Sequence, residues 1–186
     1  FTQIDLEMSF VEMEDVLKAG YFNTIIMNAK NFNDVKLWQL CEKYEVTVWY
    51  HHSTHFHSEE TSIDNYIKSI DSNLKTVKSN KKWWSLFAGF TFEEPFWMGK
   101  QSNNEFLAET EALYKKYGKR LMPMFAVYEF TSYENGNTNI DMDDKQILKI
   151  NPKSTKYLTD IGFDSYDVDV RQGAPNANRY SYWQSI

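Results

Sequence analysis

The sequence predicts an α/β fold in which six parallel strands alternate with helices in the manner of a (β/α)8 barrel. Apolar runs of strand length alternate with segments of helical period along the whole chain. No glycine-rich phosphate turn follows the first strand, which argues against a doubly wound nucleotide-binding sheet. Polar side chains instead follow several successive strands, and a barrel builds its site from such strand ends.

The predicted strands are short, apolar and rich in β-branched or aromatic residues. The fourth strand is apolar at nearly every position, as expected for a parallel strand that is covered on both faces. In chain order, we expect strands over residues 2–8, 22–27, 46–50, 86–92, 121–128 and 159–168.

The predicted helices show apolar residues at helical spacing and recognisable end signals. Gly20 and Gly118 suit the left-handed position that follows a helix, and Thr61 with Asp64 resembles an N-terminal capping pair. Polar segments at 129–144 and 171–178 are predicted loops. We expect helices over residues 11–18, 35–44, 63–77, 106–117 and 144–158, the last interrupted at Pro152, and the start of another helix over 180–186.

Composition limits the classes of protein to consider. A chain of 186 residues with 42% hydrophobic content suits a single domain, residues 1–186. The net charge of −6 and the lack of a basic stripe exclude a general nucleic-acid partner, and no apolar run approaches membrane-spanning length. The single Cys41 cannot form an internal disulfide and is expected to be a buried structural thiol.

Two adjacent carboxylates, Glu93 and Glu94, follow the fourth strand, and Pro95 fixes the turn after them. Neighbouring side chains of an extended backbone point in different directions, so these two carboxylates are not expected to act as a catalytic couple. We expect Glu94 to be a proton donor whose pKa is raised by neighbouring aromatic rings and carboxylates. Asp164, at the tip of the sixth strand, is its expected partner and Glu129 is the second choice.

All four histidines fall between residues 51 and 57, in HHSTHFH. Their spacing fits no metalloprotease or zinc-finger signature, so no metal ligand is predicted. One of His51 and His52 is expected to face the site and to bind substrate. The aromatic content of 17% also suggests platforms for sugar rings. The strand-end aromatic residues expected to contact substrate are Trp49, Trp97, Tyr128 and Tyr166.

The segments EDVLKAGYFNTIIMN, FAGFTFEEPFW and YLTDIGFDSYD resemble the barrel domains of glycoside hydrolases, in particular those with an acid/base Glu beside a Pro at the end of the fourth strand. The resemblance implies that Glu94 is the acid/base, that Glu93 contacts the sugar, that the substrate is a carbohydrate and that no cofactor is needed. An extracellular or cell-surface location is favoured. A full barrel needs about 250 residues, so we expect missing strands to be supplied by absent residues or by another segment.

The sequence therefore predicts a glycoside hydrolase that acts on a polysaccharide or glycan. Two alternatives stay open. One is a non-catalytic barrel that binds carbohydrate through the same aromatic residues. The other is a metal-dependent hydrolase that uses the histidines of residues 51–57 to activate water.

Overall fold

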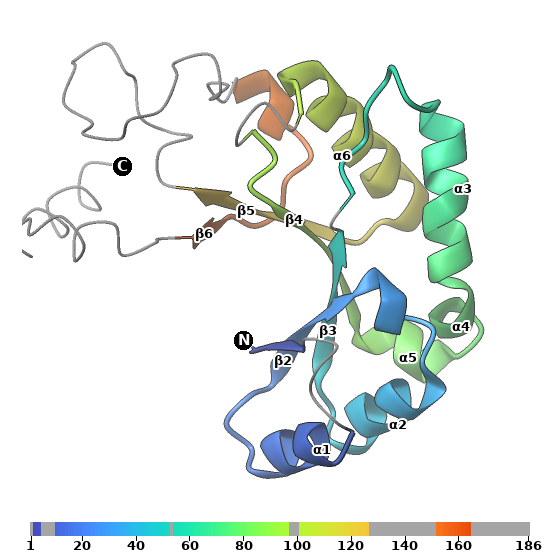
Figure 1. The fold of residues 1–186 in the computed structure, drawn as a ribbon, viewed down its shortest axis with the longest axis vertical. Coiled ribbons are helices and arrows are strands. Elements are labelled where there is room, and N and C mark those ends of the chain that lie inside the picture. Colours follow the sequence, from blue (N-terminus) through green and yellow to red (C-terminus); the bar gives the residue numbers. More distant parts are fainter. Residues whose placement is uncertain (1, 5–9, 53, 97–100, 127–151, 165–186) are drawn as a thin grey trace, which may run out of the picture.

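The fold is an α/β structure built on one parallel sheet. The computed structural model describes residues 2–4, 10–52, 54–96, 101–126 and 152–164 (Figure 1). Within these ranges, six strands pair side by side in the order β1-β2-β3-β4-β5-β6, and every pairing is parallel. The predicted α/β class and parallel sheet are therefore confirmed.

The strands and helices alternate along the chain. The strands are β1 (Thr2–Ile4), β2 (Thr24–Asn28), β3 (Thr47–His52), β4 (Phe87–Glu93), β5 (Arg120–Ala126) and β6 (Gly162–Asp164). The helices are α1 (Phe10–Lys18), α2 (Val35–Lys43), α3 (Ile63–Asn73), α4 (Lys75–Lys78), α5 (Lys81–Leu86) and α6 (Asn103–Tyr117), with short 3-10 turns η1 (Ala29–Asn31) and η5 (Pro152–Thr155). None of the described helices is both long enough and apolar enough to cross a bilayer.

The helices lie along one side of the curved sheet (Figure 1). The face of the sheet toward the helices is here called the outer face, and the opposite face the inner face. On the outer face, the rings of Tyr50 and Phe87 pack edge-on against Phe32, with centroids 4.8 and 5.4 Å apart. Cys41 of α2 is fully buried in this layer, and burial raises the pKa of its thiol to about 12. The prediction of a buried structural thiol is therefore confirmed.

The helix predicted over residues 63–77 is wrong in its length, because α3 ends at Asn73 and α4 begins at Lys75. The side chain of Asn33 reaches the break from the segment before α2. Its amide donates to Ser72 O, and its carbonyl oxygen accepts from the backbone N–H of Thr76, both at 3.4 Å. The break is thus bound by a residue about forty positions away in sequence. Helical periodicity reflects local spacing alone, so it could not predict this contact.

Two other local expectations need correction. The residue that caps α3 is Ser62, whose hydroxyl accepts from the N–H of Asn65, rather than Thr61. Residues 81–86 form the short helix α5, capped by the side chain of Asn80, so β4 begins at Phe87 and not at residue 86. Gly20 and Gly118 do adopt the expected left-handed backbone, with φ of 72° and 58°.

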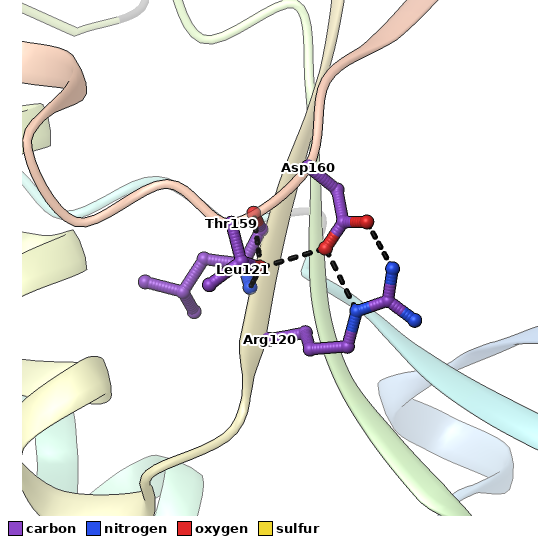
Figure 2. Close-up of polar contacts among 4 residues, drawn as sticks. All are labelled: Arg120, Leu121, Thr159 and Asp160. Carbon is purple, nitrogen blue, oxygen red and sulfur yellow. Dashed lines mark hydrogen bonds and ion pairs between the residues drawn. The ribbon is translucent and has the colours of Figure 1, made fainter.

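A cluster of polar contacts fastens the start of β6 to β5 (Figure 2). The guanidinium of Arg120 pairs with both carboxylate oxygens of Asp160. Leu121 donates its N–H to the hydroxyl of Thr159 at 2.9 Å, and its carbonyl accepts from the N–H of Thr159 at 3.1 Å. The same guanidinium lies 5.1 Å from the ring centroid of Trp49 on the inner face. These contacts therefore hold β3, β5 and the lead into β6 together.

Gly89 of β4 lies directly against the backbone of Arg120 in β5. It pairs with Trp49 on one side and with Arg120 on the other, next to an irregularity in the register of β3 and β4. A Cβ atom built on Gly89 would overlap the backbone carbonyl of Arg120. Because both groups belong to paired strands, neither can move aside without breaking the ladder.

We predict that Gly89→Ala lowers the free energy of unfolding by about 3 kcal/mol or more, at the upper end of the cost of overpacking. Chemical denaturation monitored by far-UV circular dichroism measures the loss. The matched control is Gly118→Ala, where φ is 58° but nothing lies within 4 Å of the new methyl. The control should cost only about 1 kcal/mol, and equal losses in the two variants would contradict the close approach.

Candidate functional site at the carboxyl ends of β3 and β4

The carboxyl ends of all six strands lie at the same edge of the sheet because every pairing is parallel. In sheets of this kind, ligands bind at that edge. The register places Asn28, His51, Thr91 and Met122 in one row across β2 to β5 on the inner face. Glu93 follows Thr91 two residues further toward the edge, on the same face.

His51 makes polar contacts through both ring nitrogens. Its Nδ1 lies 3.4 Å from the hydroxyl oxygen of Thr91, and its Nε2 lies 3.3 Å from a carboxylate oxygen of Glu93. The side chain of His51 is 11% exposed and that of Glu93 is 48% exposed. The pair therefore joins an enclosed imidazole to a carboxylate that solvent reaches.

Thr91 selects the ring nitrogen that carries a proton. Its buried hydroxyl donates to the carbonyl of Tyr50 at 3.5 Å, so toward His51 it presents a lone pair. Nδ1 of His51 is then the donor in that contact. Nε2 faces an acceptor-only carboxylate, and a proton between these two atoms satisfies both. This arrangement places Nε2 and Glu93 where they can share a proton, at the edge where ligands bind.

His52 points to the outer face, as alternation along β3 requires. Its ring stacks on Tyr66 of α3 with centroids 5.2 Å apart, and its Nδ1 accepts from the N–H of Thr54 at 3.2 Å. Burial, together with the charges of His55 and His51, lowers the pKa of His52 to about 3. His52 is therefore a neutral packing residue on the face away from His51.

Glu94 is buried, whereas the neighbouring Glu93 is half exposed. It is 5% exposed, and its backbone has a φ of 43°, in the left-handed region that side chains other than glycine seldom adopt. Its N–H donates to Met124 O at 2.8 Å, which extends the pairing of β4 and β5 past the end of β4. Backbone strain of this kind is often found at functional sites.

The structure places only part of the predicted site. Trp49 is buried on the inner face beneath Arg120, one row below His51. Asp164 is the last residue of β6 and therefore lies at the same edge as Glu93, opposite Ala126 in the register. The remaining predicted site residues, Trp97, Tyr128, Glu129 and Tyr166, lie outside the described residues.

Sequence reasoning missed a buried acidic residue, Glu109 of α6, which is 0% exposed. Tyr66 donates its hydroxyl to one carboxylate oxygen, and the side-chain amide of Gln101 donates to the other. Desolvation raises the pKa of Glu109 to about 7, although these hydrogen bonds act in the opposite direction. The signal was available in the sequence: Glu109 occupies the same helical face as Phe106, Thr110 and Leu113, which all lie in the core.

The described residues hold no group of three or more His, Cys, Asp or Glu side chains arranged to bind a metal ion. The histidines explain why. His51 faces the inner side of the sheet and His52 the outer side, so the two imidazoles cannot converge on one ion.

Comparisons with known proteins found little. No family model matches the chain, and no curated protein matches it. One solved structure that does match is the 7,8-dihydropteroate synthase from Vibrio fischeri, at 16% sequence identity and a TM-score of 0.42. The match covers 67% of this chain and 47% of that enzyme's chain. A likeness this distant transfers no function.

The predicted resemblance to glycoside hydrolases and the predicted hydrolysis of glycans are wrong: the comparisons find no glycoside hydrolase, and the solved structure that they do find is named as a synthase. No comparison supports the carbohydrate-binding alternative, and the described residues hold no metal-binding cluster for the histidine-based hydrolase. The local structure shows why the motif misled. Glu93 is the last residue of the buried parallel strand β4, Glu94 prolongs its pairing with β5, and Pro95 lies in the turn that follows. Such a turn is not confined to glycosidases.

We predict that His52 makes the protein less stable in acid. Its folded pKa lies below its ordinary value of 6.5, so the unfolded chain binds the proton more tightly. Stability from His52 is complete above pH 6.5 and declines as the pH falls, by about 2 kcal/mol between pH 6.5 and pH 5. Urea denaturation across this range measures the slope, and His52→Phe should change it by about 1.4 kcal/mol per pH unit, toward greater relative stability in acid. An unchanged slope would show that His52 is hydrated in the folded protein.

Proposed function

We propose that the protein is an acid–base catalyst that moves a proton to or from a small polar molecule at the carboxyl ends of β3 and β4. One observation carries the proposal: the imidazole of His51 lies between the hydroxyl of Thr91 and the half-exposed carboxylate of Glu93. A histidine oriented on one side and paired with a carboxylate on the other is a common arrangement for proton transfer near neutral pH.

The residues have distinct roles in this proposal. In this proposal Nε2 of neutral His51 takes the proton from the bound molecule, and the ionised carboxylate of Glu93 compensates the charge of the imidazolium that forms. The proton returns from Nε2 to the product. Thr91 holds Nδ1 as a donor throughout, so that Nε2 is the atom that exchanges its proton.

Glu94 and Asp164 stay candidate site residues. The left-handed backbone and burial of Glu94, and the position of Asp164 at the edge shared with Glu93, favour a place for both beside the ligand.

The barrel also stays a prediction. Sequential strand order with helices along one side is typical of a singly wound barrel, whereas a doubly wound sheet reverses its strand order.

We expect the pair to act on a general probe of proton abstraction. The elimination of 5-nitrobenzisoxazole removes a proton from carbon and releases a coloured phenolate, so absorbance reports the action of an accessible base. Both His51→Asn and Glu93→Gln should lower the protein-dependent rate at least about tenfold, since a positioned base contributes about a hundredfold or more.

The matched control for this assay is Asp15→Asn, which removes an exposed carboxylate from α1, away from the strand ends, and should leave the rate unchanged. Circular dichroism of each variant establishes that it is folded. A wild-type rate equal to that of His51→Asn would contradict the proposed function.

We predict that Thr91 fixes the tautomer of His51. In 15N-labelled protein, the two ring nitrogens of a neutral imidazole differ strongly in chemical shift, and the spectrum identifies the protonated one. At high pH the wild type and Thr91→Ser should hold the proton on Nδ1, because both keep the hydroxyl. Thr91→Val, which keeps the shape of the side chain, should lose this preference. The same tautomer in all three proteins would show that the hydroxyl has no such role.

A further inference from the structure

Residues 54–61, between β3 and α3, are here called the cover segment. Much of its backbone hydrogen bonding is to side chains that lie outside it. The N–H of Thr54 donates to His52, that of Phe56 to Glu109 at 3.4 Å, and that of Ser58 to Glu105 at 2.8 Å. The segment is therefore held in place by side chains of β3 and α6.

Three side chains at four-residue spacing hold the middle of the cover segment. Gln101 donates to the carbonyl of Phe56 at 3.1 Å, Glu105 accepts from the N–H and hydroxyl of Ser58, and Glu109 accepts from the N–H of Phe56. Side chains at this spacing line one face of a helix. Glu105 and Glu109 lie on one face of α6, and Gln101 lies just before its N-cap Ser102, so the three side chains form a row that binds residues 56–58.

The two carboxylates of this row differ in their surroundings. Glu105 lies near the surface, where four hydrogen bonds from Ser58 and Ser102 lower its pKa to about 2 in spite of partial burial. Glu109 lies in the core, and none of the ion pairs among the described residues includes it. Glu105 is thus suited to stay ionised, whereas ionisation of the buried Glu109 destabilises the folded protein.

The titratable groups around Glu109 come from three elements. Tyr66 of α3 donates to it, Glu105 of the same helix repels its charge, and His52 of β3 stacks on the far side of the Tyr66 ring. His55 and His57 belong to the cover segment itself. The donors Tyr66, Gln101 and Phe56, which surround the carboxylate of Glu109, are all neutral groups.

We propose that the cover segment is a proton-dependent latch: it closes onto α6 through Glu109 and opens when this carboxylate exchanges its donors Tyr66, Gln101 and Phe56 for water. The segment begins two residues after His52, at the carboxyl end of β3. The proposal concerns contacts on the outer face and does not depend on proton transfer by His51 and Glu93. Either proposal can therefore fail alone.

The direction of the effect follows from linkage. The closed latch holds the proton of Glu109 with a pKa of about 7, whereas an open latch exposes a carboxyl with the ordinary value of 4.5. Closure due to Glu109 is therefore most favourable below pH 4.5 and weakens as the pH rises through 7. His52 opposes closure below pH 6.5, because an open latch lets it take up a proton. The wild type and a variant of Glu109 both contain His52, so the ratio of their opening constants isolates the effect of Glu109.

Hydrogen exchange of the Phe56 and Ser58 amides at pH 6 and pH 8 tests the latch. Exchange rates divided by the intrinsic rates give the opening constant in each protein. The opening constant of the wild type relative to Glu109→Gln should rise about tenfold between the two pH values. Relative to Glu105→Gln it should change far less, because Glu105 is ionised at both pH values and only its repulsion of Glu109 differs between the two proteins.

Two outcomes would overturn the latch. One is a ratio to Glu109→Gln that does not change with pH. The other is exchange of Phe56 and Ser58 only through global unfolding, at the opening constant of the core amide of Phe90. If Glu109→Gln does not fold, Tyr66→Phe serves instead: it removes one donor to the carboxylate, so the pH dependence of the opening constant should extend to higher pH than in the wild type. An unshifted dependence would equally overturn the proposal.

Discussion

The parallel register of β3, β4 and β5 is the constraint on which the rest of the structure depends. It brings Trp49, Gly89 and Arg120 into one row and His51, Thr91 and Met122 into the next. The first row is structural: the guanidinium of Arg120 lies over the ring of Trp49, and between their strands the backbone of Gly89 leaves no room for a side chain. In the second row, the hydroxyl of Thr91 contacts Nδ1 of His51 and helps to orient its ring. A slip of one residue would turn His51 to the helices and His52 to the inner face.

This alternation gives two adjacent histidines different chemistry. His51 lies beside a carboxylate that solvent reaches, so it can exchange a proton. His52 lies among aromatic rings of the outer layer, where its charged form is excluded. The same holds for two acidic residues. Glu93, at the end of β4, is half exposed, whereas Glu109, on the helix α6 that follows, is fully buried. The surroundings, and not the residue type, decide which of them can serve a reaction.

Periodicity and end signals in the sequence predicted the α/β class, the order of the elements and the left-handed glycines at 20 and 118. They could not predict the break at Leu74, because it is occupied by Asn33 from another part of the chain. The short helix α5 was missed because six residues carry little periodic signal. For the site, the alternation of side chains along a strand predicts that His51 and His52 lie on opposite faces of the sheet. The roles of Thr91 and Glu109 required the register and the packing of α6, which no sequence pattern contains.

The burial of Cys41 has a practical consequence. The sequence contains one cysteine, and in the fold it is fully enclosed with a thiol that resists ionisation. Alkylating reagents attack the thiolate, so the native protein offers them almost no reactive sulfur. A cysteine introduced at an exposed position would therefore be the single site that a maleimide fluorophore or nitroxide spin label modifies, without prior removal of the natural one.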